Sequence, residues 1–120
     1  MKSLLDDVRE FHEALDIPIE PHPTLATEER RRLRWALISE ESNEVFEALE
    51  SADLVGIADG LADLIYVAVG TAIELGIPLD RVWDEVHRSN MAKRGGPVRE
   101  DGKRLKPEGW QPPDIKRALG

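Results

Sequence analysis

The sequence predicts an all-α protein, a four-helix bundle with a mostly irregular C-terminal tail, assembled as an oligomer. Apolar residues recur at helical spacing, residues that cap helices precede those stretches, and proline or glycine separates them. The chain has 120 residues, 41% of them hydrophobic and 33% charged, which is typical of a single globular domain. It divides into an N-terminal helix with a proline-rich connector, a central helical part and a basic tail rich in glycine and proline, at residues 1–26, 27–94 and 95–120.

The first helix begins after a capping residue. Ser3 can cap it, with Asp6 at the third helical position. The apolar stripe of this helix consists of Leu4, Val8, Phe11 and Leu15. His12 lies beside the stripe, and we expect a histidine at the edge of the core rather than a metal ligand. Residues 17–26 contain three prolines, so they form an extended connector.

Two long helices follow. Thr27 and the two glutamates after it are typical of a helix N-terminus, and this helix should end near Ser51. Asp53 can cap the next helix, which stops at Gly76. Because the connection is short, the two helices should be antiparallel neighbours. The segment 54–75 is apolar nearly all round, which predicts burial on most sides and, in so short a chain, favours an oligomer.

The fourth helix should run from Leu79 to about Lys93. Asn90 projects from the middle of its apolar face, where a buried amide needs hydrogen-bond partners. From Gly95 onward the periodicity is lost, and Trp110 is the one large apolar anchor. This tail is either poorly ordered or a flap that closes over a ligand, and a last helical turn can start near Asp114.

Carboxylates occupy positions that should be buried. On a helical wheel that advances about 100° per residue, Glu41 and Glu44 fall inside the apolar sector. That sector is defined by Leu33, Leu37, Val45 and Ala48. On the following helix, Asp59 and Asp63 lie one turn apart in a narrow polar stripe. If the two helices pack antiparallel, these four carboxylates can converge.

Bringing ionised carboxylates close together costs folding free energy because like charges repel. Two unit charges ~5.5 Å apart repel by about 3 kcal/mol at an effective dielectric constant of ~20. Three such contacts approach the whole stability of a small domain, about 5–15 kcal/mol. The site must therefore be protonated, wet or filled by metal. Oxygen ligands with no cysteine in the chain suit hard cations, so Mg²⁺ is the natural occupant and Mn²⁺ can substitute. A solvated acidic groove is the alternative reading of the same wheel.

The charge distribution separates an acidic body from a basic tail. Residues 1–86 hold 7 Lys/Arg against 20 Asp/Glu, whereas residues 87–106 hold 7 basic against 2 acidic residues. This asymmetry suits a metal site that meets an anion, and it does not suit a nucleic acid polymer, which would need a broad basic face. The first ten residues carry acids and no long apolar run, so neither a signal peptide nor a membrane partner is expected. We expect a cytoplasmic protein.

Several motifs together resemble a known superfamily. The sequences EESNE at 40–44 and DGLADLIYVAVGTA at 59–72 resemble the all-α nucleoside triphosphate pyrophosphohydrolases, which include MazG, phosphoribosyl-ATP pyrophosphohydrolase and the dimeric dUTPases. VHRSNMAKR at 86–94 and the tail ending in GWQPPDI resemble more narrowly the MazG-like, phosphoribosyl-ATP-pyrophosphohydrolase-like proteins. The similarity covers roughly residues 27–115. It implies a bundle that is usually dimeric or higher, with the helices of 27–94 as the catalytic ones.

The resemblance assigns roles to the acids. Glu41 and Glu44 match the metal-binding Glu-x-x-Glu of the superfamily, and Glu40 beside them matches a water-activating base or a second acid. Glu40 and Glu41 are therefore the catalytic candidates. The second superfamily pair is usually Glu-x-x-Asp, and Asp63 matches its last member. Gly60 stands where the glutamate would be, so Asp59 is the replacement that the resemblance suggests as the fourth metal ligand.

The resemblance also assigns substrate-binding residues. Asn90 and Lys93 match the motif that contacts sugar or phosphate, and Tyr66 and Trp110 are weaker candidates for contacts with the base. The implied reaction is Mg²⁺-dependent cleavage of the α,β-phosphoanhydride of a nucleoside triphosphate, such as dUTP or a noncanonical nucleotide, to a monophosphate and pyrophosphate. The alternatives are a phosphoribosyl-ATP pyrophosphohydrolase of histidine biosynthesis and, in another class, a non-catalytic helical module with an acidic docking groove. A homodimer or homotetramer is expected.

Overall fold

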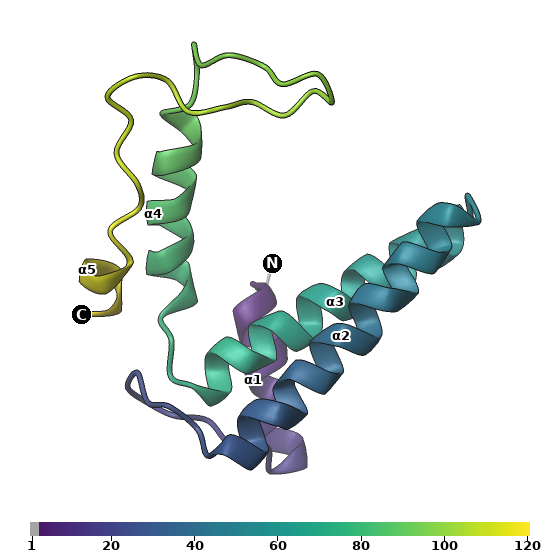
Figure 1. Cartoon of the computed structure of the whole chain (residues 1–120). Helices are drawn as coiled ribbons and strands as arrows, with labels where there is room; N and C mark the ends of the chain where they lie inside the picture. The colour runs from purple at the N-terminus through teal and green to yellow at the C-terminus, as the bar shows by residue number, and fades with distance from the viewer. Residues whose placement is uncertain (1–2) are drawn as a thin grey trace. The chain divides into compact units, whose positions relative to one another are not determined.

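The computed structural model describes residues 3–120, and the all-α expectation is confirmed there (Figure 1). The helices are α1 (Leu4–Leu15), α2 (Glu28–Glu50), α3 (Leu54–Glu74), α4 (Leu79–Met91) and α5 (Ile115–Leu119). Over these described residues the only β-type pairing is one isolated antiparallel bridge. The chain separates into two compact units, residues 1–77 and 78–120, each of which is considered by itself. The single domain, the four-helix bundle and the oligomer stay predictions.

Capping residues begin the helices where the sequence predicts. Ser3 and Asp6 form a capping box, in which the Ser3 hydroxyl accepts from the Asp6 amide. Thr27 and Asp53 accept hydrogen bonds from the amides three residues ahead, at 3.3 and 3.1 Å. Asp114 does the same for the short α5. The fourth helix ends at Met91, two residues before the expected Lys93.

The first unit is a long helical hairpin with a third helix against it. α2 and α3 lie side by side, joined by residues 51–53, and α1 packs on α3 (Figure 1). Among the described residues, the buried apolar side chains are Val8, Val45, Val69, Ala72 and Ile73. The predicted antiparallel pairing of the two long helices is confirmed.

A buried ion pair ties α2 to α3. Glu74 is 2% exposed, and Arg30 donates to both of its carboxylate oxygens at 2.7 and 2.8 Å. This hydrogen bonding raises the pKa of Arg30. Arg34 donates to the hydroxyl of Thr71 at 3.0 Å and lies 3.6 Å from Glu74. Two guanidinium groups thus satisfy one buried carboxylate and set the register of the hairpin.

His12 lies inside the core rather than at its edge, where the sequence placed it. Its side chain is 2% exposed, and Nδ1 lies 3.1 Å from the carbonyl oxygen of Pro18, at the start of the connector. The connector then returns to the end of α3, where the amides of Glu20 and Thr24 donate to the carbonyls of Ile73 and Leu75.

The third helix is less buried within one chain than its apolar sequence predicts. Leu54 and Val55 are 78% and 80% exposed, and Leu61, Ile65 and Tyr66 are partly exposed as well. The physical reason is that α1 and α2 together cover only part of its circumference. By length and composition alone α3 could also cross a membrane, a test that core helices of soluble proteins pass too.

The second unit folds the tail back along α4 (Figure 1). The indole Nε1 of Trp110 donates to the carbonyl oxygen of Ser89 at 2.6 Å, so Trp110 is the anchor that the sequence predicts. Glu85 is a second anchor, because it accepts from Arg88 and from the Asp114 amide at 2.9 Å each and lies 3.5 Å from Arg117. These contacts, rather than regular structure, order the tail.

We expect the Glu85 anchor to be lost in acid. Hydrogen bonds from Arg88 and the Asp114 amide, with the positive charges of Arg88 and Arg117, lower the pKa of Glu85 from 4.5 to about 2. Because the folded pKa is depressed, the stabilisation is complete above 4.5 and is lost as the pH falls through about 2. In an NMR pH titration the Asp114 amide should shift with a midpoint near the lower value. It should not titrate in Glu85→Gln, and a wild-type midpoint at the ordinary glutamate pKa would refute the anchor.

Candidate active site

Three carboxylates of the first unit meet between α2 and α3. Glu41 and Glu44 are three residues apart on α2 and therefore share a face, and Asp63 approaches from α3. One oxygen from each lies within 4.8 Å of the others. This acid cluster (Glu41, Glu44, Asp63) is the convergence that the helical wheels predict.

Glu41 has the least favourable environment of the three. Its Oε2 atom is buried and has no hydrogen-bond partner among the described residues. The pKa of Glu41 is raised, and loss of hydration is the largest cause. Hydrogen bonding between the carboxyl groups of Glu41 and Glu44, which requires a shared proton, raises the pKa further. Repulsion from the negative charges of Glu44, Asp63 and Glu40 acts in the same direction. An unsatisfied, charge-crowded oxygen is stabilised by a proton or by a cation. The cluster therefore has the chemistry of a cation site.

Gly60, at the position where the resemblance expects an acid, packs closely against α2. It is buried, and a Cβ atom there would lie 3.0 Å from Cγ2 of Val45 on α2. The position three residues before Asp63 thus faces the neighbouring helix at close range. A side chain there would require the Val45 side chain to shift by a few tenths of an ångström.

Asp59 lies beside the cluster rather than in it. It is exposed and shares with Glu44 an open hollow of about 310 Å³, lined also by Glu47, Ala48, Ser51, Asp53, Gly56 and Gly60. Its role as a fourth ligand stays a prediction. The sequence analysis did not select Glu47, although its spacing of three residues from Glu44 puts both on one helical face.

Glu40 and Tyr66 flank the cluster along their helices. Glu40 is exposed and contributes to the repulsion acting on Glu41. Tyr66 follows Asp63 by three residues on α3 and packs edge-on against Phe11, with ring centroids 5.4 Å apart. It lines a mostly apolar hollow of about 250 Å³ between α1 and α3. Their roles in water activation and base contact stay predictions.

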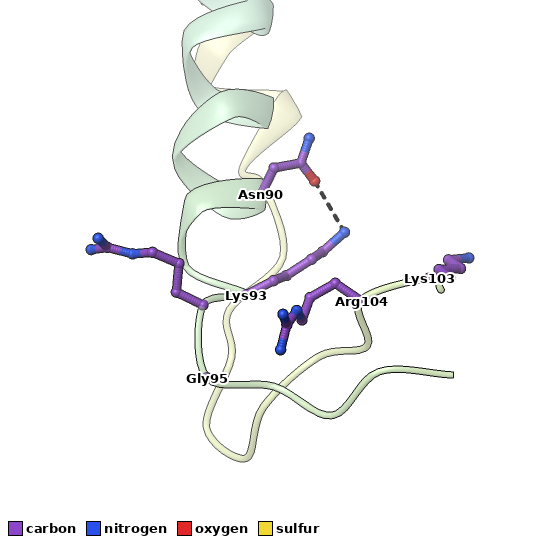
Figure 2. Close-up of a pocket in the computed structure, with 6 residues that line it drawn as sticks. Asn90, Lys93, Gly95, Lys103 and Arg104 are labelled. Carbon is purple, nitrogen blue, oxygen red and sulfur yellow. Dashed lines mark hydrogen bonds between the residues drawn. The ribbon is translucent and has the colours of Figure 1, made fainter. Parts of the chain in front are cut away.

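The remaining predicted residues belong to the second unit. Asn90 and Lys93 line a hollow of about 450 Å³ together with Arg94, Gly95, Lys103 and Arg104 (Figure 2). Asn90 is exposed rather than buried, and its Oδ1 accepts from Lys93 Nζ at 3.0 Å. The expectation of burial was wrong because the apolar face of α4 is itself little covered: Trp83 on that face is 68% exposed.

Trp110 lies next to the same lysine. The ammonium groups of Lys93 and Lys106 lie 5.5 and 4.7 Å from the centre of its ring. With its Nε1 bonded to Ser89, the indole is held by three contacts within its own unit. A contact between Trp110 and a base stays a prediction.

A comparison with protein families gives one match. The sequence model of the phosphoribosyl-ATP pyrophosphohydrolase family matches residues 8–90, which is more than half of the chain. That family belongs to the all-α, MazG-like nucleoside triphosphate pyrophosphohydrolase superfamily. The matched range contains the acid cluster, Asp59 and Asn90 and ends before Lys93 and Trp110. A search of curated protein sequences finds no match.

Proposed function

Because the chain belongs to the phosphoribosyl-ATP pyrophosphohydrolase family, whose members are hydrolases of acid anhydrides, we propose that it is a Mg²⁺-dependent nucleotide pyrophosphohydrolase. It would cleave the α,β-phosphoanhydride of a nucleoside triphosphate and release a nucleoside monophosphate and pyrophosphate. The observation that carries this proposal is the acid cluster with the buried, unpartnered oxygen of Glu41.

The donor set fits a hard divalent cation. Three carboxylates within 4.8 Å supply oxygen ligands only, which suits Mg²⁺ and also Mn²⁺. Glu41, Glu44 and Asp63 would hold the ion, with Asp59 as the nearby fourth acid. When bound, the ion would neutralise charge on the polyphosphate and support the attack of water.

Protein side chains would accept the proton of the attacking water and bind the substrate. A water molecule attacks the α-phosphorus, its oxygen forms the new bond, and the bond from that phosphorus to the bridging oxygen breaks. Glu40, exposed beside the cluster, would accept the proton of the attacking water. Asn90 and Lys93 would bind the sugar and phosphates, and Tyr66 or Trp110 would contact the base.

Two substrate classes fit the family. One is a canonical or noncanonical nucleoside triphosphate such as dUTP, in keeping with the MazG-like superfamily. The other is phosphoribosyl-ATP, the substrate named in the family description, which would place the protein in histidine biosynthesis. Both contain the same scissile bond, so the acid cluster serves either, and the base-contacting residues would decide between them.

A substrate panel tests the proposal. The protein should release pyrophosphate from at least one of dUTP, dCTP, dATP and phosphoribosyl-ATP in the presence of Mg²⁺, and EDTA should stop the release. Release of orthophosphate instead would place the scissile bond elsewhere. The competing non-catalytic docking module predicts no release and almost no thermal stabilisation by Mg²⁺ with a non-hydrolysable nucleotide, whereas the enzyme should gain several degrees.

We further propose a homodimer or homotetramer in the cytoplasm that binds neither nucleic acid polymers nor membranes. Large apolar side chains are exposed on the helical hairpin, including Trp35, Phe46, Leu54 and Val55 at 62–80%. We expect a second copy of the chain to cover these apolar side chains, because monomeric proteins rarely expose large contiguous apolar patches to water. Light scattering should give two or four times the mass of one chain. Phe46→Glu should lower this mass, whereas Glu50→Gln on the same helix should not.

A further inference from the structure

We propose that the hollow of the second unit is a polyphosphate site, which holds the phosphate chain of the nucleotide, and the pyrophosphate product, through Lys93, Arg94, Lys103 and Arg104 without a divalent cation. The inference rests on the proposed function and extends it to a ligand class and to residues beyond Lys93. The family match ends at residue 90, so these four cations lie outside the matched range. This cationic hollow (Asn90, Lys93, Arg94, Gly95, Lys103, Arg104) has a volume of about 450 Å³.

The charges of the cationic hollow lack acidic partners. Four of its six lining residues are cations, and none is an acid. Lys93 donates to the neutral amide of Asn90, and Arg104 donates to the carbonyl oxygen of Gly96 at 2.6 Å. Within residues 3–120 the side chains of Arg94 and Lys103 form neither an ion pair nor a hydrogen bond. The positive charge of this surface is thus available to a ligand.

Three other arginines of the second unit pair with acids, whereas Arg81 forms no ion pair among the described residues. Arg88 and Arg117 pair with Glu85, and Arg99 pairs with Asp101. Acids are present on the same segment, because Glu100 and Glu108 are exposed and form no ion pair with the residues that the structure describes. Four cations without acidic partners line one hollow although carboxylates are close in sequence, and Arg81, Lys106 and Lys116 are further cations without an ion pair among the described residues. A surface that keeps like charges together and unpaired is arranged for an external anion.

The backbone builds the cationic hollow before any ligand binds. Residues 97–105 form a hairpin in which the Leu105 amide donates to Pro97 and the Arg99 amide donates to Lys103, both at 2.7 Å. A Cβ atom at Gly96 would lie 2.1 Å from the carbonyl oxygen of Leu105, so only glycine permits this closure. The turn returns Arg104 to the end of α4 beside Lys93, with Lys103 at the edge of the group (Figure 2). The backbone is therefore in place before binding, and the ordering that remains is that of the lysine and arginine side chains.

Several cations spread over one hollow favour a chain of phosphates over a single anion. An orthophosphate can reach only part of such a set, whereas linked phosphates present anionic oxygens along their length. Lysine and arginine are also the side chains that bind phosphate most effectively. Affinity should therefore rise from orthophosphate to pyrophosphate to tripolyphosphate.

Titration calorimetry on the full chain in EDTA tests the site, with these three inorganic anions as probes. We expect tripolyphosphate to bind most tightly, and Lys103→Gln and Arg94→Gln each to weaken it about tenfold. Lys103→Arg should restore binding. Lys116→Gln makes the same charge change on α5, outside the hollow, and should alter affinity less than twofold. Circular dichroism checks that each variant is folded.

Each result decides one of the two proposals. Wild-type affinity in both Lys103→Gln and Arg94→Gln, an equal loss in Lys116→Gln, or orthophosphate binding as tightly as tripolyphosphate would overturn the polyphosphate site. Pyrophosphate release by a protein that shows such a result leaves the enzymatic function intact. Conversely, the expected binding pattern with no turnover of any nucleotide supports the anion site and rejects the enzymatic function.

Discussion

Glu41→Gln should reduce pyrophosphate release at least about 100-fold and at the same time make the metal-free protein more heat-stable at pH 8. Both effects follow from one oxygen. Glu41 Oε2 is buried without a hydrogen-bond partner among the described residues, so in the proposed function a cation would neutralise it, and without one its charge is unfavourable. A glutamine keeps the shape of the side chain and removes the charge.

The pH dependence of this effect has a definite sign. Burial and the neighbouring acids raise the pKa of Glu41 above its ordinary 4.5, so the folded state holds the proton more tightly than the unfolded chain. The metal-free protein therefore loses stability as the pH rises from 4.5 through the raised pKa. The stabilisation by Glu41→Gln in EDTA should be largest at alkaline pH and vanish below the ordinary value.

Thermal melts with and without Mg²⁺ measure both parts. Mg²⁺ should raise the melting temperature of the wild type and have little effect on Glu41→Gln. Glu50→Gln is the matched control, because Glu50 is an exposed acid on the same helix outside the acid cluster, and it should leave activity and the Mg²⁺ response unchanged. Full activity of Glu41→Gln, or its destabilisation in EDTA, would contradict the role assigned to this carboxylate.

Gly76→Ala should cost about 2–5 kcal/mol of folding free energy, the largest loss of stability that we expect from a single methyl group in this chain. Gly76 has φ +66°, a left-handed conformation that disfavours a side chain. A Cβ atom there would also lie 2.1 Å from the carbonyl oxygen of His22, in the connector that returns to the end of α3. Because backbone cannot move aside as a side chain can, the connector would lose its hydrogen bonds to α3. A melting temperature lower by about 10 °C or more should result.

Gly102→Ala separates the cost of a left-handed backbone conformation from the cost of a clash with neighbouring backbone. Gly102 has φ +93° and nothing within 4 Å of the position of a Cβ atom, so alanine there brings only the conformational cost of about 1–2 kcal/mol. Chemical denaturation of both variants gives the difference, which is the cost of the clash with the connector. If both substitutions destabilise the protein equally, the connector does not pack on α3 as described.

Helix boundaries could be predicted from the sequence because the signals are local. Ser3, Thr27 and Asp53 each cap a helix through an amide three residues away, an interaction that requires no knowledge of the rest of the fold. The meeting of Glu41 and Glu44 with Asp63 was predictable as well, since a short turn makes the two helices antiparallel and each wheel then places its acids on the facing side.

Other features depend on contacts that no spacing reveals. Asp59 and Asp63 lie one turn apart on the same helix, and only the packed structure shows that Asp63 joins the acid cluster, with Gly60 between them against Val45. The pairing of Glu74 with Arg30 and Arg34 links residues about forty positions apart, and nothing in the run of arginines marks which of them turns inward.

The sequence by itself thus determined the all-α class, the ends of the helices and the acids that face one another across the hairpin. Only the tertiary structure decided which carboxylates share a site, which cations remain unpaired in the cationic hollow, and how much of α3 one chain leaves exposed. The physical reason is the distance along the chain over which each interaction acts. Capping and helical periodicity act within one or two turns, whereas burial, close packing and charge pairing depend on segments that meet only after folding.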